Sequence, residues 1–148
     1  MITALRRELA TLEGTPWAGL DADIWKCFDR ICRAMAMMVA VLGGFPPAIA
    51  QAYIRYFRHA IIHNILAAGL GAPHQRKLSI AQGCPFSMAI LGGLLLPWVK
   101  LVRAAGAIPR VMADDLDITI IGGSVWLTFQ EVLAVTAEFV QDVRGTLA

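Results

Sequence analysis

Three short clusters in the sequence contain the residue types that phosphoryl-transfer chemistry requires. They span Asp23–Asp29, Gln82–Ser87 and Ala113–Asp115. Transfer of a nucleotide needs divalent metal ions, which neutralise the developing charge and align the attacking and leaving oxygens. Magnesium favours carboxylate oxygens and usually takes only one or two from the protein. Asp23 and Asp114 are therefore candidate metal ligands if the fold brings them together.

The pattern around the two acidic clusters predicts how their side chains are positioned. Apolar and acidic positions alternate near the end of Trp17–Ile24, which predicts a short strand that ends close to Asp23. Two apolar runs, Ile108–Ala113 and Leu116–Ile121, predict the arms of a hairpin with Asp114 in its turn. A carboxylate from the early strand and one from the hairpin could then meet across neighbouring strands and share two ions.

The remaining chain is predicted to be mostly helical. Apolar residues recur at helical spacing in several segments, and Gly or Pro residues interrupt them. We expect helices over Ile2–Leu12, from residue 25 to Met38, over Ala48–Ala68 with a stop at Gly69 and Gly71, over Ser87–Val102 and over Trp126–Val143, and a short strand over Lys77–Ile80.

The order and spacing of the three clusters resemble the palm motifs of reverse transcriptases of the non-LTR retrotransposon or group II intron type. Asp23–Asp29 is similar to the first motif, Gln82–Ser87 to the second and Ala113–Asp115 to the third. The separations are 59 residues (82 minus 23) and 32 residues (114 minus 82). The resemblance covers residues 17 to about 125, with Met112 and Met88 standing where the family more often has an aromatic residue and a proline.

The resemblance implies a role for each matching carboxylate. Asp23 and Asp114 would be the main metal ligands, and Asp115 an auxiliary carboxylate. The implied cofactor is Mg²⁺, with Mn²⁺ as a possible substitute. Lys26 and Asp29 match motif positions that we interpret as structural support.

The resemblance also implies a nucleotide site. Phe28 matches the aromatic gate that crowds the sugar 2′ position and favours deoxynucleotides. Gln82 and Gly83 match the segment that lines the incoming nucleotide, where a glycine lets the backbone approach closely. The implied substrates are a dNTP and an RNA or DNA template-primer.

The fold class that the resemblance implies is α/β and polymerase palm-like, a small antiparallel sheet with helices packed on one face. We expect residues 1–148 to form a single partial reverse transcriptase palm domain. Only 22 residues precede Asp23 and 33 follow Asp115 (148 minus 115), so the family's fingers and thumb regions are expected to be missing. An active RNA-directed DNA polymerase fragment could be completed by other chains that supply them.

Two other hypotheses stay open at this point. The chain could be a non-catalytic retroelement remnant or interaction module, since each cluster alone is ordinary: paired aspartates are common in turns, and Asp23 could cap a helix. An RNA-dependent RNA polymerase palm is the third hypothesis. Such palms more often have Gly before the paired aspartates, and Phe28 as a sugar gate argues against it.

The composition of the chain excludes few classes of protein function. The chain is 57% hydrophobic and 16% charged, and its net charge of +2 neither supports nor excludes a nucleic-acid partner. The three cysteines and three histidines lack metal-ligand spacing. Two uncharged stretches, Ala34–Ile54 and Leu78–Val99, contain Pro and Gly breaks, so we predict no membrane span. No N-terminal signal is evident, and we expect an intracellular protein, in nucleus or cytoplasm.

Overall fold

The computed structural model describes residues 2–24, 26–67, 69–75 and 78–147. The chain divides into two compact units. The first contains Met1–Trp25 and Leu95–Ala148, and the second contains Lys26–Leu94. The expected class is confirmed at the coarse level, because the fold is mixed α/β with a small antiparallel sheet and helices.

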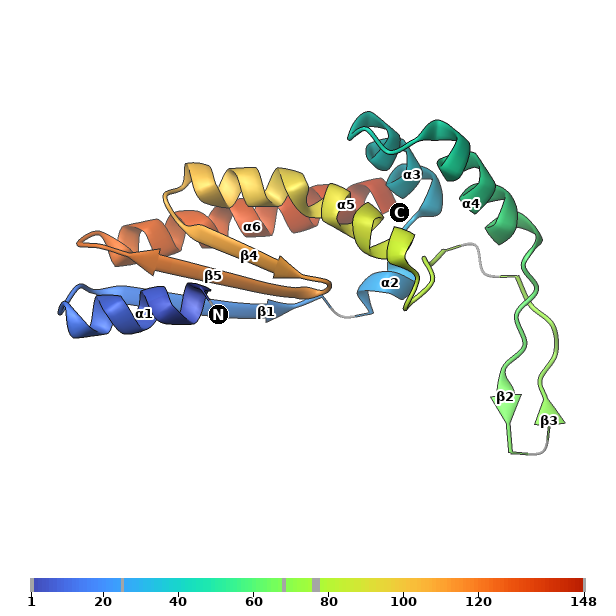
Figure 1. Ribbon diagram of the computed structural model, residues 1–148, viewed down its shortest axis with the longest axis horizontal. Coiled ribbons are helices and arrows are strands. Elements are labelled where there is room, and N and C mark those ends of the chain that lie inside the picture. The colour runs from blue at the N-terminus through green and yellow to red at the C-terminus, as the bar shows by residue number, and fades with distance from the viewer. Residues whose placement is uncertain (1, 25, 68, 76–77, 148) are drawn as a thin grey trace. The chain divides into compact units, whose positions relative to one another are not determined.

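The first unit is built on a three-stranded antiparallel sheet in the order β1-β5-β4 (Figure 1). Its strands are β1 (Trp17–Asp23), β4 (Ile108–Met112) and β5 (Asp115–Ile121). The central strand β5 buries Leu116, Ile118 and Ile120, which alternate along the strand and therefore share one face. The predicted early strand and hairpin arms are thus confirmed, each within a residue or two.

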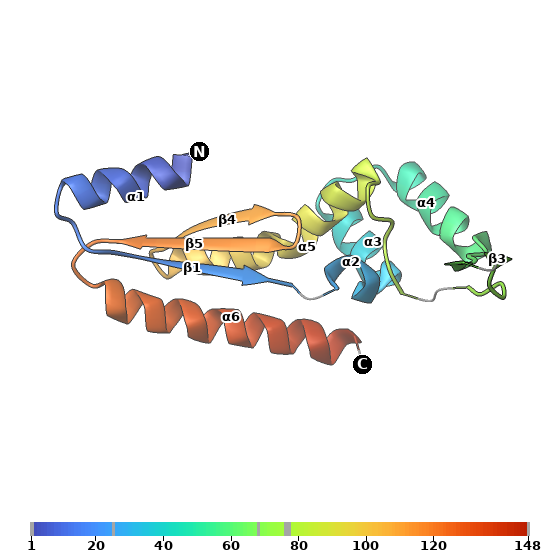
Figure 2. The ribbon, with the colours of Figure 1, turned by 90° about the horizontal axis from the view of Figure 1, so that it is seen from below.

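Helices cover both faces of this sheet, which differs from the expected one-sided packing. Figures 1 and 2 show α1 (Ile2–Leu12) and α6 (Val125–Leu147) on opposite sides of the strands. The C-terminal part of α5 (Pro85–Ala104) packs with α6, where the Trp98 indole donates a hydrogen bond to Thr136 Oγ1 at 3.1 Å. The Arg7 side chain of α1 bonds to Thr119, which lies on the other face from Ile118. The Arg7 contact, rather than an apolar stripe, attaches α1 to the sheet. The hydrophobic pattern therefore did not predict that α1 packs on this face.

The second unit contains α2 (Cys27–Arg30), α3 (Arg33–Leu42), α4 (Pro47–His59) and the N-terminal part of α5. A short two-stranded hairpin, β2 (Ile65–Leu66) with β3 (Gly69–Leu70), follows α4.

One arginine joins three segments of the second unit. Arg33 donates hydrogen bonds to the carbonyl oxygens of Ser79 at 2.6 Å, Leu78 at 2.8 Å and Phe57 at 3.4 Å. Its guanidinium also lies 4.5 Å from the centroid of the Phe57 ring. Carbonyl groups outside regular structure need donors when water is displaced, and Arg33 supplies them.

Two predicted helices of the second unit are wrong in extent. The helix expected to reach Met38 breaks at Ile31 and Cys32, which are extended, and the Ile31 carbonyl accepts a bond from Ser79 N at 3.0 Å. The helix expected over Ala48–Ala68 ends at His59.

Beyond His59 the chain forms an antiparallel arm, in which Ile62 and His74 exchange two backbone bonds of 2.9 Å. β-Branched isoleucines are frequent here and favour extended backbone. Lys77, the start of the strand predicted over Lys77–Ile80, lies outside the described residues, and residues 78–80 form no strand.

Among the described helices, α5 is long and apolar enough to cross a membrane by length and composition. Buried helices of other proteins meet the same two criteria. Leu95, Trp98 and Val102 of α5 are buried, and Pro97 lies inside the helix. The helix therefore does not by itself indicate a membrane span.

Replacing Ile118 by Ala should lower the free energy of unfolding by about 2–5 kcal/mol, because the change removes apolar burial and leaves a cavity. Ile118 is 1% exposed. Ile121→Ala in the same strand is the matched control, since Ile121 is 36% exposed and should cost about 1 kcal/mol or less. Urea denaturation followed by circular dichroism measures both, and equal losses would contradict the assigned buried face.

Candidate functional site

Each of the two neighbouring strands β1 and β5 carries a pair of aspartates two residues apart. The pairs are Asp21 with Asp23, and Asp115 with Asp117. Successive side chains of a strand point to opposite faces, so residues two apart share a face. Four carboxylates therefore lie on one face of a three-stranded sheet.

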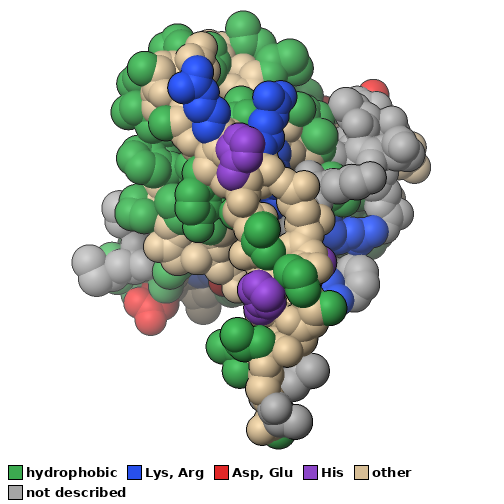
Figure 3. Space-filling model, turned by 90° about the vertical axis from the view of Figure 1, so that its right-hand side faces the viewer, with side chains coloured by type: hydrophobic (Ala, Val, Ile, Leu, Met, Phe, Trp, Pro, Cys, Tyr) green, Lys and Arg blue, Asp and Glu red, His purple; other side chains and the backbone are tan. Residues whose placement is uncertain are grey.

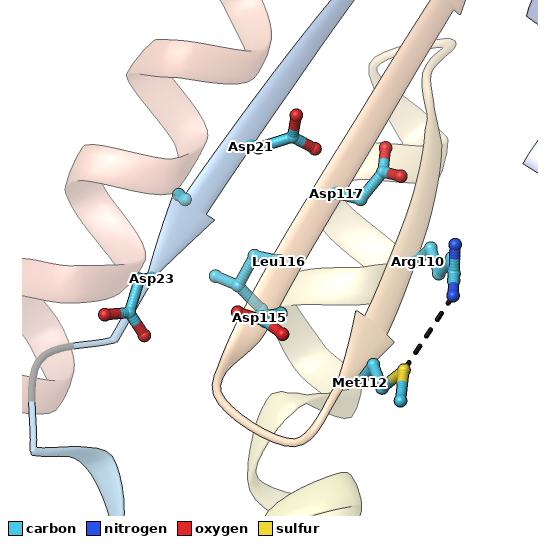
Figure 4. Close-up of a pocket in the computed structure, with 8 residues that line it drawn as sticks. Asp21, Asp23, Arg110, Met112, Asp115, Leu116 and Asp117 are labelled. Carbon is cyan, nitrogen blue, oxygen red and sulfur yellow. Dashed lines mark hydrogen bonds between the residues drawn. The ribbon is translucent and has the colours of Figure 1, made fainter. Parts of the chain in front are cut away.

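The antiparallel register brings these carboxylates together in two opposed pairs. Asp23 is the cross-strand partner of Asp115, and Asp21 is the partner of Asp117. Figure 4 shows the Asp23 and Asp115 side chains near the turn that joins β4 to β5, with Asp21 and Asp117 further along the strands.

A backbone hydrogen bond at the strand end defines the spacing of these pairs. The Ile24 amide donates to the carbonyl of Asp114 at 3.1 Å. Directly opposed residues that exchange such bonds alternate with non-hydrogen-bonded pairs, in which the Cα atoms are only about 4.5 Å apart. Asp23 and Asp115 form such a close pair, and so do Asp21 and Asp117.

The carboxylates line a pocket of about 400 Å³ on this face. All of its lining residues belong to the three strands of the first unit. They are Asp21, Ala22, Asp23, Arg110, Met112, Asp115, Leu116 and Asp117.

The Arg7 side chain balances the charge at one end of the pocket. The Arg7 Nη2 atom forms an ion pair with Asp117 Oδ1 at 2.5 Å, and Arg7 Nε donates to Thr119 Oγ1 at 2.9 Å. Arg110 is the cross-strand partner of Asp117 from β4. Gly19 makes room for the guanidinium, because a Cβ atom at Gly19 would lie 3.1 Å from Arg7 Cζ.

The other end of the pocket has no such balance among the described strand neighbours. Asp115 has Asp23 on one side and Met112 on the other. Like charges directly opposite each other in a sheet destabilise it, and both carboxylates are exposed to solvent. A cation bound there would relieve this repulsion, so the Asp23–Asp115 end is the stronger candidate for a metal site.

Asp114 lies in the turn between β4 and β5. The preceding Ala113 has a φ of 59°, the left-handed conformation that tight turns often require. Asp114 is half-buried, and Asp115 rather than Asp114 is among the described residues that line the pocket. The expected convergence of early strand and hairpin is therefore present, with Asp115 as the direct partner of Asp23.

The chemistry of these donors suits a hard divalent cation. Carboxylate oxygens are the ligands that Mg²⁺ prefers, and it usually keeps several water ligands. Within the described residues, no three His, Cys, Asp or Glu side chains are arranged to hold a metal ion. The fit therefore rests on the opposed pair Asp23 and Asp115, with Asp114 one residue away.

The other predicted site residues belong to the second unit. Phe28 is buried, at 9% exposure, and its carbonyl accepts a bond from Ile80 N at 2.9 Å. Gln82 and Gly83 lie in an exposed turn closed by a bond from Cys84 N to Ala81 O at 3.3 Å.

Within this turn, Gly83 has a φ of +78° and a Cβ there would face open space. The turn conformation, rather than crowding, therefore accounts for the glycine.

Sequence reasoning gave too little weight to four residues of the pocket face. The predicted site does not include Asp21, Asp117, Arg7 or Arg110. The repeated Asp-x-Asp spacing in two predicted strands was the available signal, because it puts both carboxylates of each strand on one face. Arg7 carried no comparable signal.

Comparisons of the sequence with protein-family models and with curated proteins give no match.

Replacing Arg7 by Met should lower the free energy of unfolding by about 1–3 kcal/mol, because Thr119 loses its donor and Asp117 keeps an unpaired charge. Thr119 is 0% exposed. The matched control is Arg6→Met, since Arg6 is exposed on the same helix.

Urea denaturation of both variants measures the difference. Adding Asp117→Asn to Arg7→Met should recover part of the loss, since it removes the uncompensated carboxylate. Equal stabilities of the Arg7→Met and Arg6→Met proteins would contradict a structural role for the Arg7 contacts.

Proposed function

We propose that this chain is the palm segment of an RNA-directed DNA polymerase, a reverse transcriptase of the non-LTR retrotransposon or group II intron type. The reaction would be nucleotidyl transfer from a dNTP to a primer paired with an RNA or DNA template. The palm-like fold is part of the proposal.

The observation that carries the proposal is the cross-strand pairing of Asp23 with Asp115 beside the turn that holds Asp114. Asp23 lies about ninety positions before Asp114 and Asp115 in the sequence. Asp23 comes from the first cluster of the sequence pattern, and the other two come from the third. An opposed, solvent-accessible carboxylate pair lowers the stability of the sheet through like-charge repulsion, and a bound cation would offset this cost.

Each carboxylate has a separate task in this proposal. Asp23 and Asp115 would offer oxygens from opposing strands, and Asp114 would offer its own from the turn. The bound Mg²⁺ or Mn²⁺ would neutralise the charge that develops on the transferred phosphate and align the attacking and leaving oxygens. Arg7 holds Asp117 in an ion pair and so leaves the other carboxylates as the uncompensated ones.

The nucleotide contacts in this proposal come from the second unit. Phe28 would restrict the sugar 2′ position, and the exposed turn at Gln82 and Gly83 would contact the nucleotide. The burial of Phe28 fits packing as well as gating.

A second candidate, an interaction module without catalysis, is favoured by exposed apolar residues in the first unit. Leu5, Leu9 and Leu12 are 54–84% exposed and lie at helical spacing on one face of α1. Trp126 and Leu127 at the start of α6 are 67% and 68% exposed. Such surfaces commonly mark contacts with another protein.

Primer extension separates the two candidates. With Mg²⁺ or Mn²⁺, a primed RNA template and dNTPs, the wild-type chain should incorporate nucleotide, and EDTA should abolish this. Asp23→Asn and Asp114→Ala should each reduce incorporation about 100-fold or more, since losing a metal ligand removes several kcal/mol of transition-state stabilisation.

Glu131→Ala serves as the matched carboxylate control, because Glu131 is an exposed residue of α6. It should retain wild-type incorporation. Background incorporation that is equal in wild type and Asp114→Ala would contradict the polymerase proposal and favour the interaction module. Incorporation of rNTPs in preference to dNTPs would favour an RNA-dependent RNA polymerase instead.

A further inference from the structure

The weak net charge of the chain conceals a strong segregation of charge between the two units. The second unit, residues 26–94, contains seven Lys and Arg but only one acidic residue, Asp29, which gives a formal charge of +6. The first unit contains six Lys and Arg against ten Asp and Glu, which gives −4. No Asp or Glu occurs between Asp29 and Asp114. The net value of +2 is therefore a poor guide to the surface of either unit.

Helix α4 presents part of this positive charge on one face. Arg55, Arg58 and His59 follow the i, i+3, i+4 spacing that places side chains side by side, and all three are exposed. Tyr53 and Phe57 are buried on the other side of the helix. The buried side fixes the orientation of α4, so its basic face is held towards solvent.

The antiparallel arm after α4 extends this face. Ile62 pairs with His74 at the base of the arm, and β2 pairs with β3 towards its tip. His63 is exposed, and its Nδ1 atom lies 3.0 Å from the Gly71 carbonyl oxygen. Figure 3 shows Arg side chains on the helix and His side chains along the arm.

Ordinary structural roles account for only part of this charge. Arg33 is used to join three segments of the unit. Arg58 and His59 lie in the last turn of α4, where positive charge favours the helix dipole. Arg55 lies a turn earlier, and no ion pair is recorded for Arg55 or Arg58 among the described residues. Exposed positive charge without neighbouring carboxylates attracts anions.

We propose that the basic face of α4 and the arm, residues 55–74, bind the phosphate backbone of a nucleic acid. Arg55 and Arg58 supply the phosphate contacts, because guanidinium groups match phosphate oxygens in geometry as well as charge. Tyr56, 66% exposed beside them, offers a ring on which an unpaired base can stack. The surface uses no residue of the carboxylate pocket, so it does not depend on the polymerase chemistry.

Fluorescence anisotropy with the full chain tests this surface. The probes are a labelled 30-nucleotide RNA strand and a DNA duplex, titrated between 50 and 200 mM salt. The double variant Arg55→Gln/Arg58→Gln should bind the duplex about 10-fold or more weakly than wild type, and the slope of log K against log salt should fall by about 1.8, which is about 0.9 for each lost phosphate contact.

Lys100→Gln/Arg103→Gln is the matched control, because both residues are exposed on α5 in the first unit and the charge change is the same. This control should stay within about threefold of wild type, since neither residue belongs to the proposed surface and only general electrostatic attraction is lost. If both double variants lost the same affinity for nucleic acid, binding would depend on net charge alone, and the proposal would be overturned. Unchanged binding in Arg55→Gln/Arg58→Gln would overturn it too, as would binding of the wild type to anionic lipid vesicles but not to either nucleic acid.

Hydrogen exchange of the wild-type chain provides a readout that needs no variant. Added RNA should slow exchange within residues 55–74, whereas slowing confined to the first unit would contradict the assigned surface. Asp114→Ala should bind nucleic acid like wild type. Loss of primer extension with intact binding thus tests the carboxylate pocket, and loss of binding in Arg55→Gln/Arg58→Gln tests the basic face.

Discussion

The antiparallel register between β1 and β5 is the constraint on which the candidate site depends. A slip of one residue would turn every side chain of β1 to the other face of the sheet and separate Asp23 from Asp115. Backbone bonds hold the register at both ends, from Gly122 N to Pro16 O at 2.9 Å and from Ile24 N to Asp114 O at 3.1 Å. The buried apolar residues of β5 fix which face is acidic. Burial and backbone pairing therefore bring together carboxylates that repel each other.

The two units divide the charge of the chain in a way that matches two different chemical tasks. Carboxylates gather on a sheet face of the first unit, where the Arg7 ion pair offsets the charge at only one end. Positive charge with a single carboxylate, Asp29, is concentrated in the second unit, where helix α4 exposes Arg55 and Arg58. An acidic face suits cations, and a basic face suits phosphate. Metal-assisted chemistry on a nucleic acid would use both, and the average composition hides this division.

Much of the first unit could be predicted from the sequence, because strand alternation and a short turn are local patterns. These patterns gave β1 and the β4–β5 hairpin within a residue or two, and helical periodicity gave the start of α6, which continues to Leu147 rather than ending at Val143. The pairing of Asp23 with Asp115 rather than Asp114 could not be predicted, since it depends on a register between strands about ninety residues apart.

The second unit was harder to predict for a related reason. The helices break at Ile31 and His59, where backbone groups bond to distant segments or to the arm. Helical periodicity is a local pattern and cannot predict such distant partners. Arg7 is a comparable case, because a single polar residue on an amphipathic helix has no periodic signature. The roles of Phe28, Gln82 and Gly83 remain predictions from the resemblance.

Anomalous diffraction from crystals of the chain soaked in Mn²⁺ tests the central claim most directly. The account predicts an anomalous peak on the acidic sheet face, within about 2.5 Å of carboxylate oxygens of Asp23 and of Asp114 or Asp115, a generous limit for a hard divalent cation bound to oxygen. A well-ordered structure with no peak there, or with Mn²⁺ bound only elsewhere, would contradict it.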